Sequence, residues 1–66
     1  MDIITINEFI TALQSECYVD ADTVIKASKS KLTIYNNPTL EELVEDWKTG
    51  EYDPADLLIE AEELLN

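Results

Sequence analysis

The chain has 66 residues, of which 15 are acidic and four are lysine, with no arginine or histidine, so its formal net charge is −11. A charge of this sign excludes direct binding to nucleic acid and to anionic membranes, because both repel it. The hydrophobic content of 45% is typical of a folded protein rather than a disordered one. Every apolar run is shorter than the roughly 18 residues of a membrane span. We therefore expect one cytoplasmic domain over residues 1–66, with no membrane partner.

The first predicted element is a helix over about residues 6–16. Thr5 and Glu8 have the spacing of a capping box, and apolar residues recur at helical spacing behind it. This apolar stripe consists of Ile6, Phe9, Ile10, Leu13 and Cys17. Cys17 is the single cysteine, so it cannot form an internal disulfide, and we expect it to be buried as a small hydrophobic residue.

The middle of the chain is predicted to form a two-stranded antiparallel hairpin. Val24 and Ile34 are examples of the β-branched residues that favour a pleated surface here. We expect residues 23–28 to pair with residues 31–35. The alternative is a helix over residues 20–31. Its buried face would consist of Ala21, Val24, Ile25 and Ser28.

The next predicted element is a helix over about residues 40–48, with apolar residues at helical spacing. Thr39 and Glu42 have the spacing of a capping box and give one start for this helix. Asn37, which is followed by a proline, gives an alternative start. Gly50 is expected to end the helix.

The last predicted helix covers residues 54–65. Asp53 is suited to its N-cap and Pro54 to its first turn, and leucines recur along one face. The order of elements is therefore α-β-β-α-α. We expect a small α+β domain in which the N-terminal helix and the hairpin pack on the C-terminal helical pair.

The acidic residues are concentrated in the predicted C-terminal helices. Residues 1–37 carry five acids and three lysines, a net charge of −2, whereas residues 38–66 carry ten acids and one lysine, a net charge of −9. Like charges four residues apart destabilise a helix by about 0.2–0.5 kcal/mol per pair. Three such pairs are Glu41 with Glu45, Glu42 with Asp46, and Asp56 with Glu60.

The acids of these two helices are interpreted as a site that binds a basic, Lys- and Arg-rich protein surface. Tyr52 is included as an aromatic anchor, because aromatic residues contribute strongly to interfaces. The predicted partner-binding residues are Glu41, Glu45, Asp46, Tyr52, Asp56, Glu60, Glu62 and Glu63. The alternative is a solvated face that only keeps the chain soluble.

The sequence predicts no catalytic, metal or cofactor site. Without His the chain lacks the usual general base, and without Arg it lacks a bidentate clamp for anions. Asp20 and Asp22 have the spacing that opens a calcium loop, but Ile25 and Lys31 occupy the positions that need Gly and Glu. We therefore expect a protein that is not an enzyme.

Three segments together carry a resemblance to a known class of proteins: "INEFITAL", "VIKASKSKLTIY" and "LEELVEDWKTGEYDPADLLIEAEELL". Their predicted order and their charge resemble small acidic phage-encoded inhibitors of the anti-CRISPR, nucleic-acid-mimic type. The resemblance implies an inhibitor in the host bacterial cytoplasm. It would block the DNA-recognition site of a CRISPR nuclease or of another nucleic-acid-binding enzyme.

A second hypothesis is a non-catalytic structural or assembly module that forms a homodimer. A chain of this size buries only about 60% of its unfolded surface, so a second copy would extend the core. The apolar surface would consist of Leu57, Leu58, Leu64 and Leu65. Salt distinguishes the two hypotheses, because added salt weakens binding to a basic partner but not apolar association.

Overall fold

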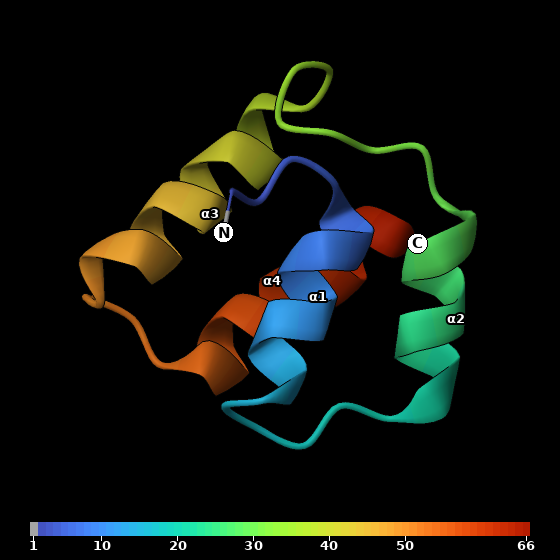
Figure 1. Ribbon diagram of the computed structural model, residues 1–66, viewed down its shortest axis with the longest axis horizontal. Coiled ribbons are helices and arrows are strands. Elements are labelled where there is room, and N and C mark those ends of the chain that lie inside the picture. The colour runs from blue at the N-terminus through green and yellow to red at the C-terminus, as the bar shows by residue number, and fades with distance from the viewer. Residues whose placement is uncertain (1) are drawn as a thin grey trace.

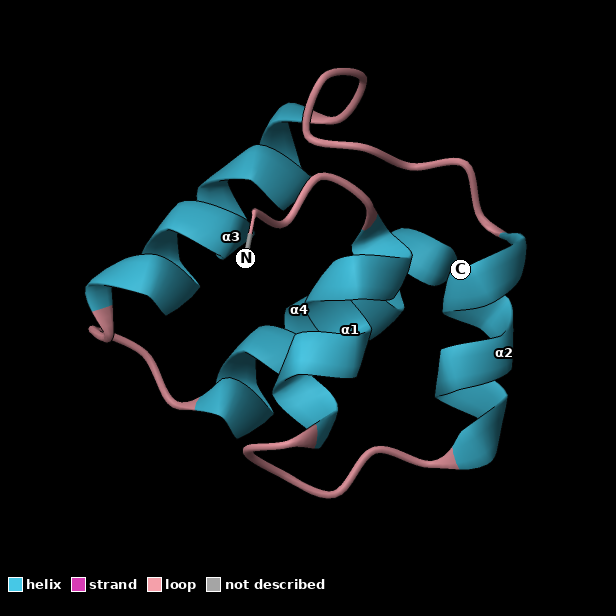
Figure 2. Ribbon diagram, in the orientation of Figure 1, coloured by secondary structure: helices cyan, strands magenta, loops and turns pink. Residues whose placement is uncertain are grey.

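A computed structural model of the chain describes residues 2–66, which form four α-helices (Figure 1). They are α1 (Ile6–Gln14), α2 (Ala21–Lys29), α3 (Pro38–Thr49) and α4 (Pro54–Leu65). α4 contacts each of the other three helices, and α1 also packs against α2. The segments between the helices are loops (Figure 2). None of the helices in the described residues is both long and apolar enough to cross a membrane.

The hydrophobic core is built around α1. Ile6, Phe9, Ile10 and Leu13 are completely buried, which confirms the predicted apolar stripe, and Cys17 beyond the helix is half-buried. The other helices contribute smaller sets of buried apolar residues. These are Ala27 from α2, Leu40, Leu43 and Val44 from α3, and Leu57 and Ala61 from α4.

The starts of α1 and α3 follow local capping interactions, whereas Asp53 precedes α4 as predicted but makes no capping hydrogen bond with its side chain. The Thr5 Oγ1 accepts a hydrogen bond from the Glu8 backbone N–H, and a Glu8 carboxylate oxygen accepts one from the Thr5 N–H, each at 3.1 Å. The capping box is therefore confirmed, although α1 ends at Gln14, two residues earlier than expected. α3 begins after Asn37, whose side chain accepts from the Leu40 N–H at 3.1 Å. Of the two predicted starts for this helix, Asn37 is the correct one.

The predicted hairpin is wrong, because its first strand is the helix α2. Asp20 caps this helix: its Oδ1 accepts from the Thr23 N–H at 2.8 Å. An Asp N-cap contributes about 1 kcal/mol, and Lys26 and Lys29 in the last turn interact favourably with the helix dipole. Each β-branched residue opposes the helix by less than about 0.7 kcal/mol. The local balance therefore allows a helix, and packing against α1 and α4 stabilises it.

The buried face of α2 also differs from the predicted alternative. Thr23 and Ala27 point into the protein, whereas Ile25 and Ser28 are exposed and Val24 is half-buried. Ala21, the remaining member of the predicted face, is exposed as well. The alternative prediction of a helix over this segment was correct, but the helix buries a different face from the one predicted.

The second predicted strand is also wrong, because its segment makes only one bridge, to the residues before α1, and then turns at residues 34–36. The Ile34 N–H donates to the Ile4 carbonyl at 2.8 Å, and the Ile6 N–H donates to the Leu32 carbonyl at 3.0 Å. These bonds flank a single isolated bridge between residues 5 and 33. Within residues 2–66 no strand is formed. The α+β class and the order α-β-β-α-α are thus corrected to a small all-helical domain.

The cap of α2 makes stability depend on pH. The Thr23 backbone N–H, followed by the Thr23 hydroxyl, lowers the pKa of Asp20 below its ordinary value. A carboxylate with a lowered folded-state pKa stabilises the folded state above its unfolded pKa of about 3.9 and loses this contribution as pH falls through the folded value. We expect Asp20→Asn to lower the Tm at pH 7, and the difference from wild type to shrink below a pH of about 4.

Circular dichroism melts between about pH 2 and pH 7 measure this effect. Asp22→Asn is the matched control, since it makes the same change in net charge on the same helix but leaves the cap hydrogen bonds in place. An Asp20→Asn melt that stays equally far below wild type at the acid end of the range would contradict the prediction.

Candidate functional site

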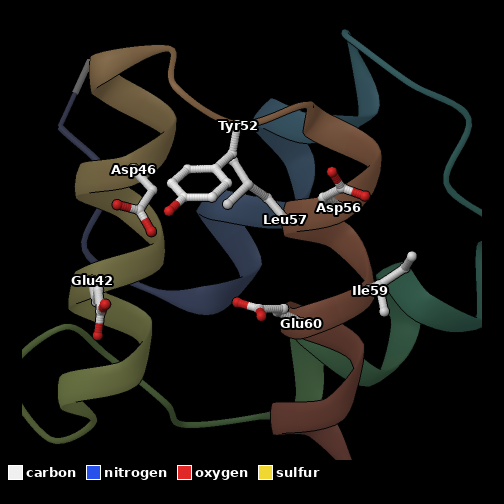
Figure 3. Close-up of a pocket in the computed structure, with 7 residues that line it drawn as sticks. All are labelled: Glu42, Asp46, Tyr52, Asp56, Leu57, Ile59 and Glu60. Atoms are coloured by element: carbon white, nitrogen blue, oxygen red, sulfur yellow. The ribbon is translucent and has the colours of Figure 1, made fainter.

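A groove of about 460 Å³ lies between α3 and α4 (Figure 3). This α3–α4 groove is lined by Glu42, Asp46, Tyr52, Asp56, Leu57, Ile59 and Glu60. Its volume lies within the range of about 300–1,000 Å³ that is usual for small-ligand sites. It is therefore large enough to receive a side chain of another molecule.

Two of the like-charged pairs predicted from the sequence meet at this groove. Glu42 and Asp46 come from α3, and Asp56 and Glu60 come from α4. Residues four apart lie on the same face of a helix, so packing these two faces together gathers four carboxyl groups. Figure 3 shows the Glu60 carboxylate directed toward α3. The lining contains no lysine to offset these charges.

Tyr52 and Ile59 are the exposed apolar residues of the lining. Their side chains are 52% and 56% exposed, whereas Leu57 is buried, and Ile59 projects from the side of α4 away from Tyr52 (Figure 3). The Tyr52 ring lies across the space between the helices, with its hydroxyl on the side of Asp46 (Figure 3). Gly50 ends α3 in the left-handed conformation, at φ 75°, and Pro54 begins α4, so a short turn positions the ring.

This arrangement is suited to a Lys or Arg side chain. The aliphatic part of such a side chain can cover the Tyr52 ring while its cationic end reaches the carboxylates. The carboxylates do not converge as a metal site: among the described residues, no group of three or more His, Cys, Asp or Glu is placed to hold a metal ion.

The structure brings together four of the predicted partner-binding residues, namely Asp46, Tyr52, Asp56 and Glu60. The exposed Glu41, Glu45 and Glu63 lie outside the groove. Sequence reasoning left out three residues of the lining: Glu42, Leu57 and Ile59. The spacing of Glu42 from Asp46 was a usable signal, but nothing in the sequence placed Ile59 at a groove.

Glu62 has a different position and a structural role. The Thr23 hydroxyl lies 2.9 Å from Glu62 Oε1 and 2.9 Å from Asp20 Oδ1. A hydroxyl carries one proton, so it donates to one of these carboxylates at a time. This contact joins α4 to the start of α2.

The leucines proposed for self-association serve the core. Leu57 is buried, and Leu58, Leu64 and Leu65 are half-buried and packed against the core. The structure thus leaves little of this apolar surface for a second copy.

The resemblance to acidic phage-encoded inhibitors was based on the predicted order of elements and on the charge of the sequence. The structure corrects that order of elements. Comparison of the chain with protein-family models, with curated proteins and with solved structures finds no match.

Proposed function

We propose that the protein is a non-catalytic inhibitor that binds a basic protein surface through its α3–α4 groove. The observation that carries this proposal is the meeting of two acidic pairs from two helices beside exposed apolar side chains. Each pair opposes helix formation because its two carboxylates repel each other. A cationic partner would attract both carboxylates of a pair and offset their repulsion. The net charge of −11 would also accelerate encounter with a positive surface.

The target best suited to this groove is a protein that binds nucleic acid. Such proteins present Lys and Arg side chains in rows that neutralise phosphates. Carboxylates held on two packed helices offer regularly placed negative charge to the same side chains. Binding here would exclude the nucleic acid by competition, and it would weaken as salt rises.

The test compares two charge-reversed variants that have the same net charge. Glu42→Lys/Glu60→Lys changes the groove, whereas Glu45→Lys/Glu63→Lys changes exposed acids of the same two helices outside the groove. The probe is a fluorescein-labelled peptide of alternating arginine and serine, and its anisotropy is measured at low and high salt. Two lost attractions and two new repulsions, at about 0.2–1 kcal/mol each, predict that the groove variant binds the peptide about fourfold to several hundredfold more weakly than wild type.

The control variant is expected to bind within about threefold of wild type, as distant charges are screened. Equal losses in both variants would show that net charge alone drives binding and would overturn the groove as the site. A second measurement addresses mimicry: the unlabelled peptide is first bound to a labelled DNA duplex, and wild-type protein is added. Release of the duplex is expected, and retention of the duplex would contradict nucleic-acid mimicry.

A further inference from the structure

Tyr52 lines two neighbouring hollows of the surface. Besides the α3–α4 groove it lines a hollow of about 350 Å³ at the end of α3. This Trp47 hollow is lined by Glu16, Trp47, Gly50, Tyr52, Asp53 and Pro54. Since the same half-exposed side chain borders both spaces, it forms a ridge between them.

The Trp47 hollow has the chemistry of a cation site in its own right. It contains two aromatic side chains and two carboxylates, and no lysine lines it. Aromatic faces attract cations, and Trp does so most strongly. The Trp47 ring is held edge-on against the buried Phe9, with the ring centres 6.5 Å apart and the planes at 85°. The core therefore fixes this ring before any partner binds, which reduces the entropy lost on binding.

Arginine fits this pair of hollows better than lysine. Its planar guanidinium stacks on aromatic rings, is weakly hydrated and donates in a fork to carboxylates. Two guanidinium groups, one stacked on each face of the Tyr52 ring at a contact distance of about 3.5–4.0 Å, would lie roughly 7–8 Å apart. In an extended chain, residues i and i+2 point to the same side and lie about 6.6 Å apart.

We propose that the partner binds through an extended segment with the pattern Arg-x-Arg, placing one arginine in the α3–α4 groove and the other in the Trp47 hollow, on either side of Tyr52. This inference rests on the proposed function and names the class of partner segment. It makes Tyr52 the central contact of the interface, between six carboxylates. The other exposed tyrosines, Tyr18 and Tyr35, line neither hollow.

The experiment is an NMR titration of the ¹⁵N-labelled protein with three short peptides. Acetyl-Gly-Arg-Gly-Arg-Gly-amide has the proposed spacing, acetyl-Gly-Arg-Arg-Gly-Gly-amide has the same composition and charge, and acetyl-Gly-Arg-Gly-Gly-Gly-amide has one arginine. We expect the first peptide to bind about fivefold to tenfold tighter than the single-arginine peptide and clearly tighter than its isomer. It should shift the amide signals of Glu16 and Gly50 as well as those of Asp56 and Glu60.

Two substitutions at the ridge test the aromatic contact. Tyr52→Phe keeps the ring and should retain the preference for the Arg-Gly-Arg peptide, whereas Tyr52→Leu should reduce binding to the level of the single-arginine peptide. Tyr35→Leu is the matched control at an exposed tyrosine away from both hollows and should leave binding unchanged. Because Tyr52 lies at the surface of a loop, these variants are expected to stay folded, which their amide spectra report directly.

The outcomes separate this inference from the proposed function. Equal affinity for the two isomeric peptides, or shifts confined to the α3–α4 groove, would overturn the two-arginine pattern and leave the groove as a site for basic side chains. An absence of shifts with all three peptides would overturn both. The inference would be supported if wild type, Tyr52→Phe and Tyr35→Leu all prefer the Arg-Gly-Arg peptide and only Tyr52→Leu loses this preference.

Discussion

Phe9→Ala is expected to lower the free energy of unfolding by about 3–5 kcal/mol, the largest effect of any single change considered for this chain. Phe9 is completely buried in the core and contacts the Trp47 ring edge-on. A domain of this length has a total stability of roughly 3–10 kcal/mol. The substitution should therefore leave a large part of the population unfolded, because the cavity cannot be refilled by its neighbours.

Urea denaturation followed by Trp47 fluorescence and by circular dichroism measures this loss. Phe9→Leu keeps the site apolar and is expected to remain folded. Its free energy of unfolding should exceed that of the alanine variant by about 1.5 kcal/mol or more. Tyr35→Ala removes a similar ring from a side chain that is 78% exposed, and it should change stability by less than about 0.5 kcal/mol. Similar losses for Phe9→Ala and Tyr35→Ala would contradict the placement of Phe9 in the core.

Asp46→Asn/Glu60→Gln is expected to make the protein more stable and to weaken its binding to basic peptides. The two changes break both like-charged pairs of the α3–α4 groove while keeping Asp56 in the first turn of α4. Glu60→Gln also breaks the pair that Glu60 forms with Glu63, so removing three repulsions of about 0.2–0.5 kcal/mol each predicts a gain of roughly 0.6–1.5 kcal/mol. For a domain of this size, this corresponds to an increase in Tm of about 2–12 °C.

The matched control for this variant is Glu45→Gln/Glu63→Gln. It makes the same change in net charge and also breaks three like-charged pairs, Glu41 with Glu45, Glu42 with Glu45, and Glu60 with Glu63, but both changed residues lie outside the groove. We expect a similar rise in Tm with binding of the arginine–serine peptide retained. The groove variant should bind about tenfold more weakly than this control. A decrease in Tm would contradict the prediction that the acidic pairs of the groove destabilise the protein. Equal binding by the two variants would contradict the groove as the binding site.

Several helix ends could be predicted from the sequence because they depend on residues three or four positions apart. The capping box at Thr5, the Asn37 cap and the Gly50 end are all local interactions, and the structure contains each of them. The acidic pairs are local in the same sense. A spacing of four on a helix places two carboxylates on one face whatever the rest of the chain does.

Residues 21–29 show where local reasoning stops. Their β-branched residues favour a strand, whereas the Asp20 cap and the lysines of the last turn favour a helix, and these preferences differ by about 1 kcal/mol or less. Burial of Thr23 and Ala27 against α1 and α4 decides between them. The predicted strand over residues 31–35 was wrong as well, since residue 33 makes a single bridge to residue 5, before α1, and residues 34–36 form a turn.

The sequence by itself determined where the helices α1 and α4 begin, which residues of α1 are buried, and which acidic side chains share a helix face, whereas it left two starts open for α3. Only the tertiary structure decided that the pair on α3 and the pair on α4 line one groove together with Tyr52 and Ile59. The physical reason is that the rotation of each helix about its axis is set by core packing. Leu43 and Val44 of α3, with Leu57 and Ala61 of α4, must be buried at once, and this orientation brings the acidic faces together.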